Sequence, residues 1–164
     1  MHPLIQEAMK KAAVAWLTTP GIPGGYAVWC LWVDDALYLV TGEGEQPAPG
    51  LADGGSVDVA VRGDHGGRIL TWPAAATALE PGSPEWDTIA PQLAAKRLNA
   101  PGPVDETVTR WAASCRLYRL APVADPVEAG ASLSDASGAA PPRPTPATSS
   151  TPKPFRLHRV RGAR

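Results

Sequence analysis

The chain has 164 residues, of which 44% are hydrophobic and 19% charged, and its formal net charge is -1. That length suits a single domain with a core of its own. No run of residues approaches the roughly 18 consecutive apolar positions of a membrane-spanning helix, and the first residues lack the basic-then-apolar plan of a signal peptide. We therefore expect a soluble, cytoplasmic protein with no membrane partner.

The charges are distributed unevenly along the chain. All 16 acidic residues lie within residues 1–140 against nine basic ones, a net charge of -7, whereas residues 141–164 hold six basic residues and no acidic one. Residues 129–151 are almost wholly Ala, Gly, Ser, Thr and Pro, a composition with too little apolar surface to offset the entropy of folding. We predict a folded domain over residues 1–127 and a disordered tail over 128–164. The basic end of the tail has no motif that reads a nucleic-acid groove, so we interpret it as solvated rather than as a nucleic-acid site.

The folded part reads mainly as strands. After a helix predicted over residues 3–12 with Pro3 in its first turn, the pattern predicts strands over 13–18, 26–33, 36–41, 56–62, 68–80 and 114–121. The acidic pair at residues 34–35 joins the second and third of these as a hairpin. Pro73 is expected to interrupt the long fifth strand.

Two further helices are predicted between the last two strands. Ser83 and Pro84 have the residue types of an N-cap and a first helical position, and they open a helix to about Asn99 that Pro91 should kink or split. A second helix is predicted over residues 105–112. Six strands at hairpin spacing with few helices between them favour an antiparallel barrel over a doubly wound sheet.

The two cysteines and the tryptophans constrain the chemistry. Cys30 and Cys115 lie far apart, without a CxxC motif or a histidine at ligand spacing, so we favour two free, buried thiols over a disulfide and predict no metal site. Trp29 and Trp32 have opposite strand parity, so one should point into the barrel and the other outward. An outward Trp suits either a subunit interface or a platform for stacking a planar ring. We favour the interface, and hence a homodimer.

The order of these segments resembles the pyridoxamine 5'-phosphate oxidase-like family, the flavin-binding split β-barrels. The resemblance lies in the short helix leading into residues 14–19, in the aromatic run, acidic turn and Leu-Tyr-Leu-Val-Thr of residues 26–41, and in the alternating residues 57–61. It covers residues 3–121. It implies a mainly β (α+β) fold, a six-stranded antiparallel split barrel with peripheral helices. It also implies a homodimer that holds FMN or a related deazaflavin.

The family resemblance also implies where the flavin phosphate would bind. The segment after the third strand usually carries a Ser or Thr and a Lys, because a phosphate dianion needs a hydroxyl donor and a cation. Here Thr41 can supply the hydroxyl, but Gln46 or Pro47 stands where the lysine is expected, and Glu43 and Glu45 would repel a phosphate. Other residues are candidates to complete a cofactor site: the cations Arg62, Arg68, Lys96 and Arg97, and the stacking residue Trp29.

Two hypotheses of different classes follow. In the first, the protein is a flavin- or deazaflavin-binding oxidoreductase that transfers hydride to or from a small molecule, with the cofactor supplying the redox chemistry. In the second, it is a cofactor-free split barrel that has lost the phosphate site and acts as a binding or scaffold module. The sequence identifies neither the substrate nor a catalytic residue.

Overall fold

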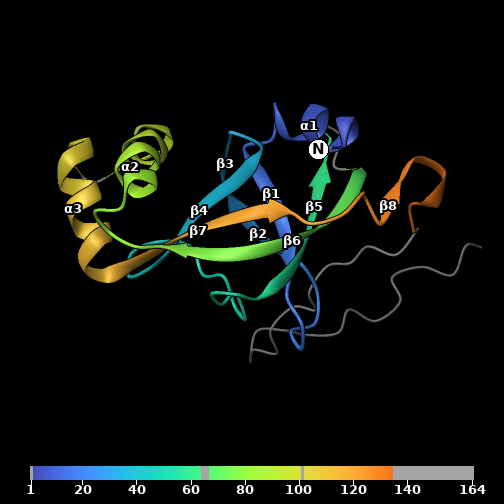
Figure 1. Cartoon of the computed structure of the whole chain (residues 1–164), viewed down its shortest axis with the longest axis horizontal. Coiled ribbons are helices and arrows are strands. Elements are labelled where there is room, and N and C mark those ends of the chain that lie inside the picture. Colours follow the sequence, from blue (N-terminus) through green and yellow to red (C-terminus); the bar gives the residue numbers. More distant parts are fainter. Residues whose placement is uncertain (1, 64–66, 101, 135–164) are drawn as a thin grey trace, which may run out of the picture.

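In the computed structural model, residues 2–63, 67–100 and 102–134 are described, and they form one curled antiparallel sheet with helices on both of its faces (Figure 1). The helices are α1 (Pro3–Met9), α2 (Pro84–Lys96) and α3 (Val104–Ser114), with a short 3-10 turn at Gly130–Ser132. The strands are β1 (Val14–Thr18), β2 (Tyr26–Trp29), β3 (Leu31–Val33), β4 (Ala36–Gly42), β5 (Ser56–Arg62), β6 (Arg68–Leu79), β7 (Cys115–Pro122) and β8 (Glu128–Ala129). Within these ranges, no helix is long and apolar enough to cross a membrane.

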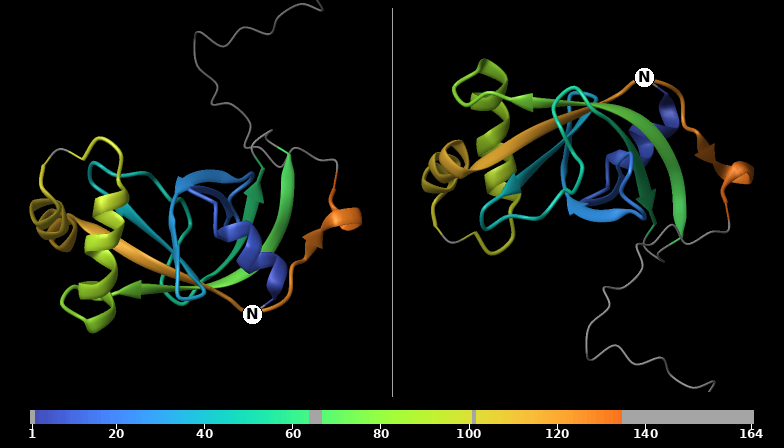
Figure 2. Two further views of the ribbon diagram at one scale, coloured as in Figure 1. Left: turned by 90° about the horizontal axis from the view of Figure 1, so that it is seen from above. Right: turned by 90° about the horizontal axis from the view of Figure 1, so that it is seen from below.

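The strand order explains the curl. The sheet runs β2-β1-β5-β6-β7-β4-β3, so its two end strands are consecutive in the chain. Only Cys30 separates them, and its N–H donates to the carbonyl of Ala13 at 3.0 Å. The sheet must therefore bend back until its two ends approach each other, as the views from above and below show (Figure 2).

This closure corrects the expected strand count. The single strand predicted over residues 26–33 is divided at Cys30, because its first half pairs with β1 and its second half pairs with β4. With β8 added, the described residues contain eight strands rather than six. The hairpin at residues 34–35 is confirmed, and both of its turn residues have the positive φ that such a turn requires.

Alternation along the strands divides the core into two clusters. On β4, Leu37 and Leu39 face the barrel interior, which α1 covers, whereas Tyr38 and Val40 face α2 and α3. The predicted alternation of β5 is confirmed, because its three valines are buried and Asp58 is exposed.

The two tryptophans of opposite parity lie on opposite faces, as predicted. Trp32 packs edge-on against Trp72 in the interior, with ring centroids 5.9 Å apart. Trp29 packs in the other cluster against Trp111 of α3, at 6.4 Å. Trp29, the outward tryptophan, is therefore partly covered by its own chain. Neither the predicted subunit interface nor the predicted stacking platform included this contact within the chain.

The helices differ from their predicted bounds for local reasons. The first helix ends at Met9 rather than at residue 12, because the chain turns there to enter β1. Pro91 does not split α2, which is one helix that ends at Lys96 rather than at Asn99. The helix predicted over residues 105–112 is α3, which begins one residue before and ends two residues after the predicted bounds.

Pro73 does not interrupt the long strand. It is in register with Asp58 of β5, and its carbonyl accepts the N–H of Val123 on the opposite side. The N–H and the C=O of a strand residue point to the same side, so the missing donor of Pro73 faces the stretch between the end of β7 and the start of β8. The proline is tolerated in β6 because the one bond it cannot make lies just past the end of β7 at Pro122, where the ladder stops.

The folded part extends beyond the predicted boundary at residue 127. Glu128 and Ala129 form β8, which pairs with β6, and the Glu128 carboxylate makes an ion pair with Arg68 at 3.1 Å. A two-residue strand has no periodicity, so composition alone assigned it to the tail. The remainder of the predicted tail, residues 135–164, lies outside the described residues.

Replacing Ser83 with alanine should lower the free energy of unfolding by about 1 kcal/mol. The Ser83 hydroxyl oxygen accepts the N–H of Trp86 at 3.2 Å and so caps α2. Urea unfolding of both proteins measures the change, and Ser83→Asp, which keeps an acceptor, should retain most of the stability. Equal midpoints for the serine and alanine proteins would show that the cap contributes nothing.

Candidate functional site

A groove of about 710 Å³ opens where β4 and β6 end and β7 begins, and we call it the mouth groove. Its apolar lining includes Ala48, Leu51, Ala78 and Tyr118. Three of these pack against the interior cluster and the fourth belongs to it, so the groove lies at the open end of the barrel. The mouth of a β-barrel is a common place for a small-molecule site.

Thr41 and Arg116 lie side by side on this groove. They are register partners on β4 and β7, so their side chains project from the same face of the sheet. Arg116 is exposed, and it makes no hydrogen bond or ion pair within the part of the chain that the structure describes. The predicted hydroxyl thus has an available cation as its neighbour. Of the carboxylates in the described part of the chain, that of Glu80 alone lines the same groove.

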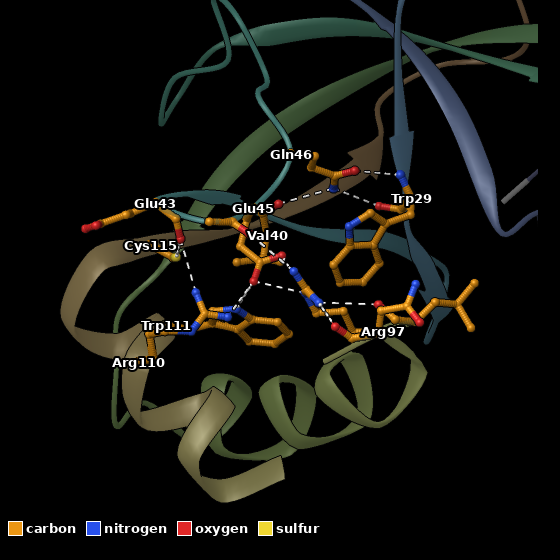
Figure 3. A network of polar contacts seen from close by, with 12 residues as sticks. Trp29, Val40, Glu43, Glu45, Gln46, Arg97, Arg110, Trp111 and Cys115 are labelled. Atoms are coloured by element: carbon orange, nitrogen blue, oxygen red, sulfur yellow. Dashed lines mark hydrogen bonds and ion pairs between the residues drawn. The ribbon is translucent and has the colours of Figure 1, made fainter. Parts of the chain in front are cut away.

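Glu45 is held at the centre of a network that we call the Glu45 cage (Figure 3). Its fully buried carboxylate accepts bonds from Arg97 Nε at 2.8 Å, from Arg110 Nη2 at 2.7 Å and from the Trp111 indole N–H at 2.8 Å. Burial raises the pKa of this carboxyl, but the three donors outweigh burial, so the pKa lies below its ordinary value. The cage ties the loop after β4 to the end of α2 and to α3.

The cage changes the expected roles of two charges. Glu45 was expected to repel a phosphate, but two guanidinium groups neutralise its charge. Arg97 was expected to bind a phosphate, but it also donates to the carbonyls of Gly44, Leu98 and Asn99. Within the described residues, its donors are therefore committed to the fold.

Gln46 has an equally specific structural role. Its side-chain oxygen accepts the N–H of Trp29 at 2.7 Å, and its side-chain nitrogen donates to the carbonyls of Trp29 at 2.9 Å and Val40 at 3.2 Å (Figure 3). The amide thus imitates a peptide group and links β2 to β4 near the point where the barrel closes. A lysine could not do this, because an ammonium group has no acceptor.

The structure distributes the six predicted site residues over three places. Thr41 lies on the mouth groove. Arg62 and Arg68 line a second groove on the other side of the barrel wall, where the Arg62 guanidinium lies 4.8 Å from the centre of the Trp16 ring. The last three line a third, smaller pocket: Trp29, Lys96 and Arg97.

Sequence reasoning missed the residue that accompanies Thr41. Arg116 lies 75 positions later in the chain, and it reaches Thr41 only through the pairing of β4 with β7. The available signal was strand parity, since Arg116 alternates with the buried Leu117. Parity alone gives no register, so it could not pair the two residues.

Both cysteines are free thiols. Burial raises the pKa of Cys30 to about 12, so that thiol stays neutral. Cys115 is half-buried on the mouth groove, and its pKa is raised, mainly by burial. Among the described residues, no three His, Cys, Asp or Glu side chains gather where they would hold a metal ion.

Comparison with known proteins identifies the architecture. Neither a family profile nor a curated protein matches the sequence. A solved structure does match: HutZ, the heme storage protein from Vibrio cholerae, with a TM-score of 0.56 and 18% identity over 75% of this chain and 90% of that chain. The chain has the split-barrel fold. This confirms the fold class expected from the sequence, and at this identity the likeness extends to the fold alone.

Proposed function

We propose that the protein binds a phosphorylated flavin, FMN or a deazaflavin, in the mouth groove and acts as an oxidoreductase on a small molecule. The observation that carries this proposal is the pairing of Thr41 with Arg116, which makes no ion pair in the described chain. A hydroxyl and a guanidinium together supply the donors and the positive charge that a phosphate dianion requires. Arg116 thus takes the place of the lysine that the family resemblance leads one to expect.

The groove suits the rest of such a ligand. Its volume of about 710 Å³ lies within the range of roughly 300–1,000 Å³ of most small-molecule sites. Leu51, Ala78 and Tyr118 offer an apolar surface to a planar ring. Because the Glu80 carboxylate would repel a phosphate, the phosphate should bind on the Thr41 side of Arg116. A bound flavin would supply the hydride transfer, and the chain would hold and shield it. We further propose a homodimer, which sedimentation measurements would test.

A cofactor-free binding or scaffold module is the second candidate, and a specific observation favours it. The Glu45 cage and the three bonds of Gln46 commit the loop after β4 to the protein's own structure. A split barrel that no longer binds a cofactor would be free to use its phosphate loop in this way. On this reading, the mouth groove would have no preference for phosphorylated ligands.

Arg116→Gln should weaken FMN binding by roughly ten- to hundredfold, the effect of losing a charge-assisted hydrogen bond to a phosphate. Thr41→Val should weaken it several-fold, because it removes a neutral donor. Quenching of tryptophan fluorescence by added FMN measures both affinities. Arg119→Gln is the matched control, since Arg119 lies on the same strand with the opposite parity and pairs with Glu85.

Two outcomes would count against the proposal. Unchanged FMN affinity in Arg116→Gln would place the phosphate elsewhere. A wild-type protein that binds no flavin at high concentration would favour the cofactor-free candidate.

A further inference from the structure

A second pocket, separate from the mouth groove, lies between the start of β1, the end of β2 and the end of α2. Its volume is about 290 Å³, and it is lined chiefly by the apolar groups of Val14, Trp29, Cys30 and Leu98. We call it the Trp29 pocket. Figure 3 shows the Trp29 ring and the Arg97 side chain beside it.

The walls of the Trp29 pocket leave apolar surface uncovered. Leu98 follows α2 with 86% of its surface exposed, and Val14 at the start of β1 is 40% exposed. The indole of Trp29 is half-buried and rests on Trp111. Apolar side chains grouped around a concavity mark a place where a ligand or partner is covered.

The rim of the pocket is positively charged. Lys96 lines it, is exposed, and has no ion-pair or hydrogen-bond partner among the described residues. Arg97 lines it too, but its charge is paired with the Glu45 carboxylate. No described acidic residue lines the pocket. Its occupant should therefore bear a negative charge next to an apolar body.

We propose that the Trp29 pocket binds a small apolar carboxylate, with its hydrocarbon body between Trp29 and Leu98 and its carboxylate on Lys96. The volume admits one aromatic ring system or a short alkyl chain, and it is too small for a complete flavin nucleotide. Lys96 is the one cation of the rim that has no partner among the described residues, and it matches a singly charged acid rather than a phosphate dianion. The site shares no lining residue with the mouth groove, so this proposal stands or falls independently of flavin binding.

Calorimetric titration with 2-naphthoate, and with neutral 2-naphthamide as its uncharged analogue, tests the proposal on the full chain. We expect naphthoate to bind about tenfold more tightly than naphthamide, and Lys96→Gln to abolish that difference. Leu98→Ser should weaken both ligands about threefold. Both changes are at exposed positions, so both variants should fold. Arg116→Gln is the matched control, because it removes an equally unpaired cation at the other groove and should leave naphthoate affinity unchanged.

Three results would overturn the proposal. The first is that naphthoate does not bind. The second is that naphthoate still binds to Lys96→Gln but no longer binds to Arg116→Gln, because this would place the acid in the mouth groove. The third is self-association of the wild-type chain that Leu98→Ser abolishes, which would make a second copy the occupant of the pocket. Sedimentation velocity on both proteins distinguishes this third result from the others.

Discussion

Glu45→Ala is expected to lower the free energy of unfolding by about 3–5 kcal/mol, the usual effect of breaking a buried ion pair by removing one partner. The substitution would leave the guanidinium groups of Arg97 and Arg110 without their shared carboxylate, and these side chains are only 17% and 32% exposed. The indole N–H of Trp111 would also lose its acceptor. Urea unfolding measures the change.

Glu43→Ala is the matched control, because Glu43 is an exposed acid two residues away and should change stability by less than about 0.5 kcal/mol. Similar losses in the two variants would contradict a special role for the Glu45 cage.

The pH dependence of this contribution has a definite sign. Because the pKa of Glu45 is lower in the folded chain than in the unfolded chain, its stabilising effect is complete above the unfolded value of roughly 4.3 and is lost as the pH falls through the folded value. The difference in stability between wild type and Glu45→Gln should therefore shrink between pH 7 and pH 3. A difference that stays constant over this interval would show that the carboxylate charge is not what stabilises the cage.

Gln46→Ala is expected to lower the free energy of unfolding by about 2–4 kcal/mol. The change removes three hydrogen bonds and leaves the N–H and C=O of Trp29 and the C=O of Val40 without this partner, and each group left unsatisfied costs roughly 1–3 kcal/mol. Gln46→Lys, which restores the residue type expected from the family, should cost nearly as much, because it lacks the acceptor for the Trp29 N–H. Urea unfolding again provides the measurement.

The control for Gln46 is Gln92→Ala. Gln92 lies on the exposed face of α2, and its one side-chain bond among the described residues goes to the carbonyl one turn earlier, so its loss should have little effect. If Gln46→Lys were as stable as wild type, the Gln46 amide would not be needed to link β2 to β4. If this variant also bound FMN more tightly, a lysine at position 46 would be able to bind the phosphate.

Local patterns predicted most of the fold. The alternation of Val57, Val59 and Val61 placed β5 correctly, and the cap at Ser83 placed the start of α2. Two features depended on distant contacts instead. The division of residues 26–33 at Cys30 follows from barrel closure, which local alternation does not encode, and β8 exists only because part of β6 extends beyond the reach of β7.

The candidate site was less predictable because its charges act in pairs. Glu45 was interpreted as a charge that repels a phosphate, and Arg97 as a phosphate ligand. In the fold the two side chains, 52 positions apart in the chain, form an ion pair with each other. Thr41 was singled out as the hydroxyl of a phosphate site and lies on the mouth groove, whereas Arg116 became its neighbour only through the register of β4 and β7. Residue types and spacing cannot supply such long-range pairings.

Parallel calorimetric titrations of the wild-type chain with FMN and with riboflavin test the central claim most directly, because the two ligands differ only in the phosphate. If Thr41 and Arg116 hold that phosphate, FMN should bind roughly ten- to hundredfold more tightly than riboflavin. Equal affinities for the two ligands, or no binding of either, would contradict the assignment of the mouth groove as a site for a phosphorylated flavin.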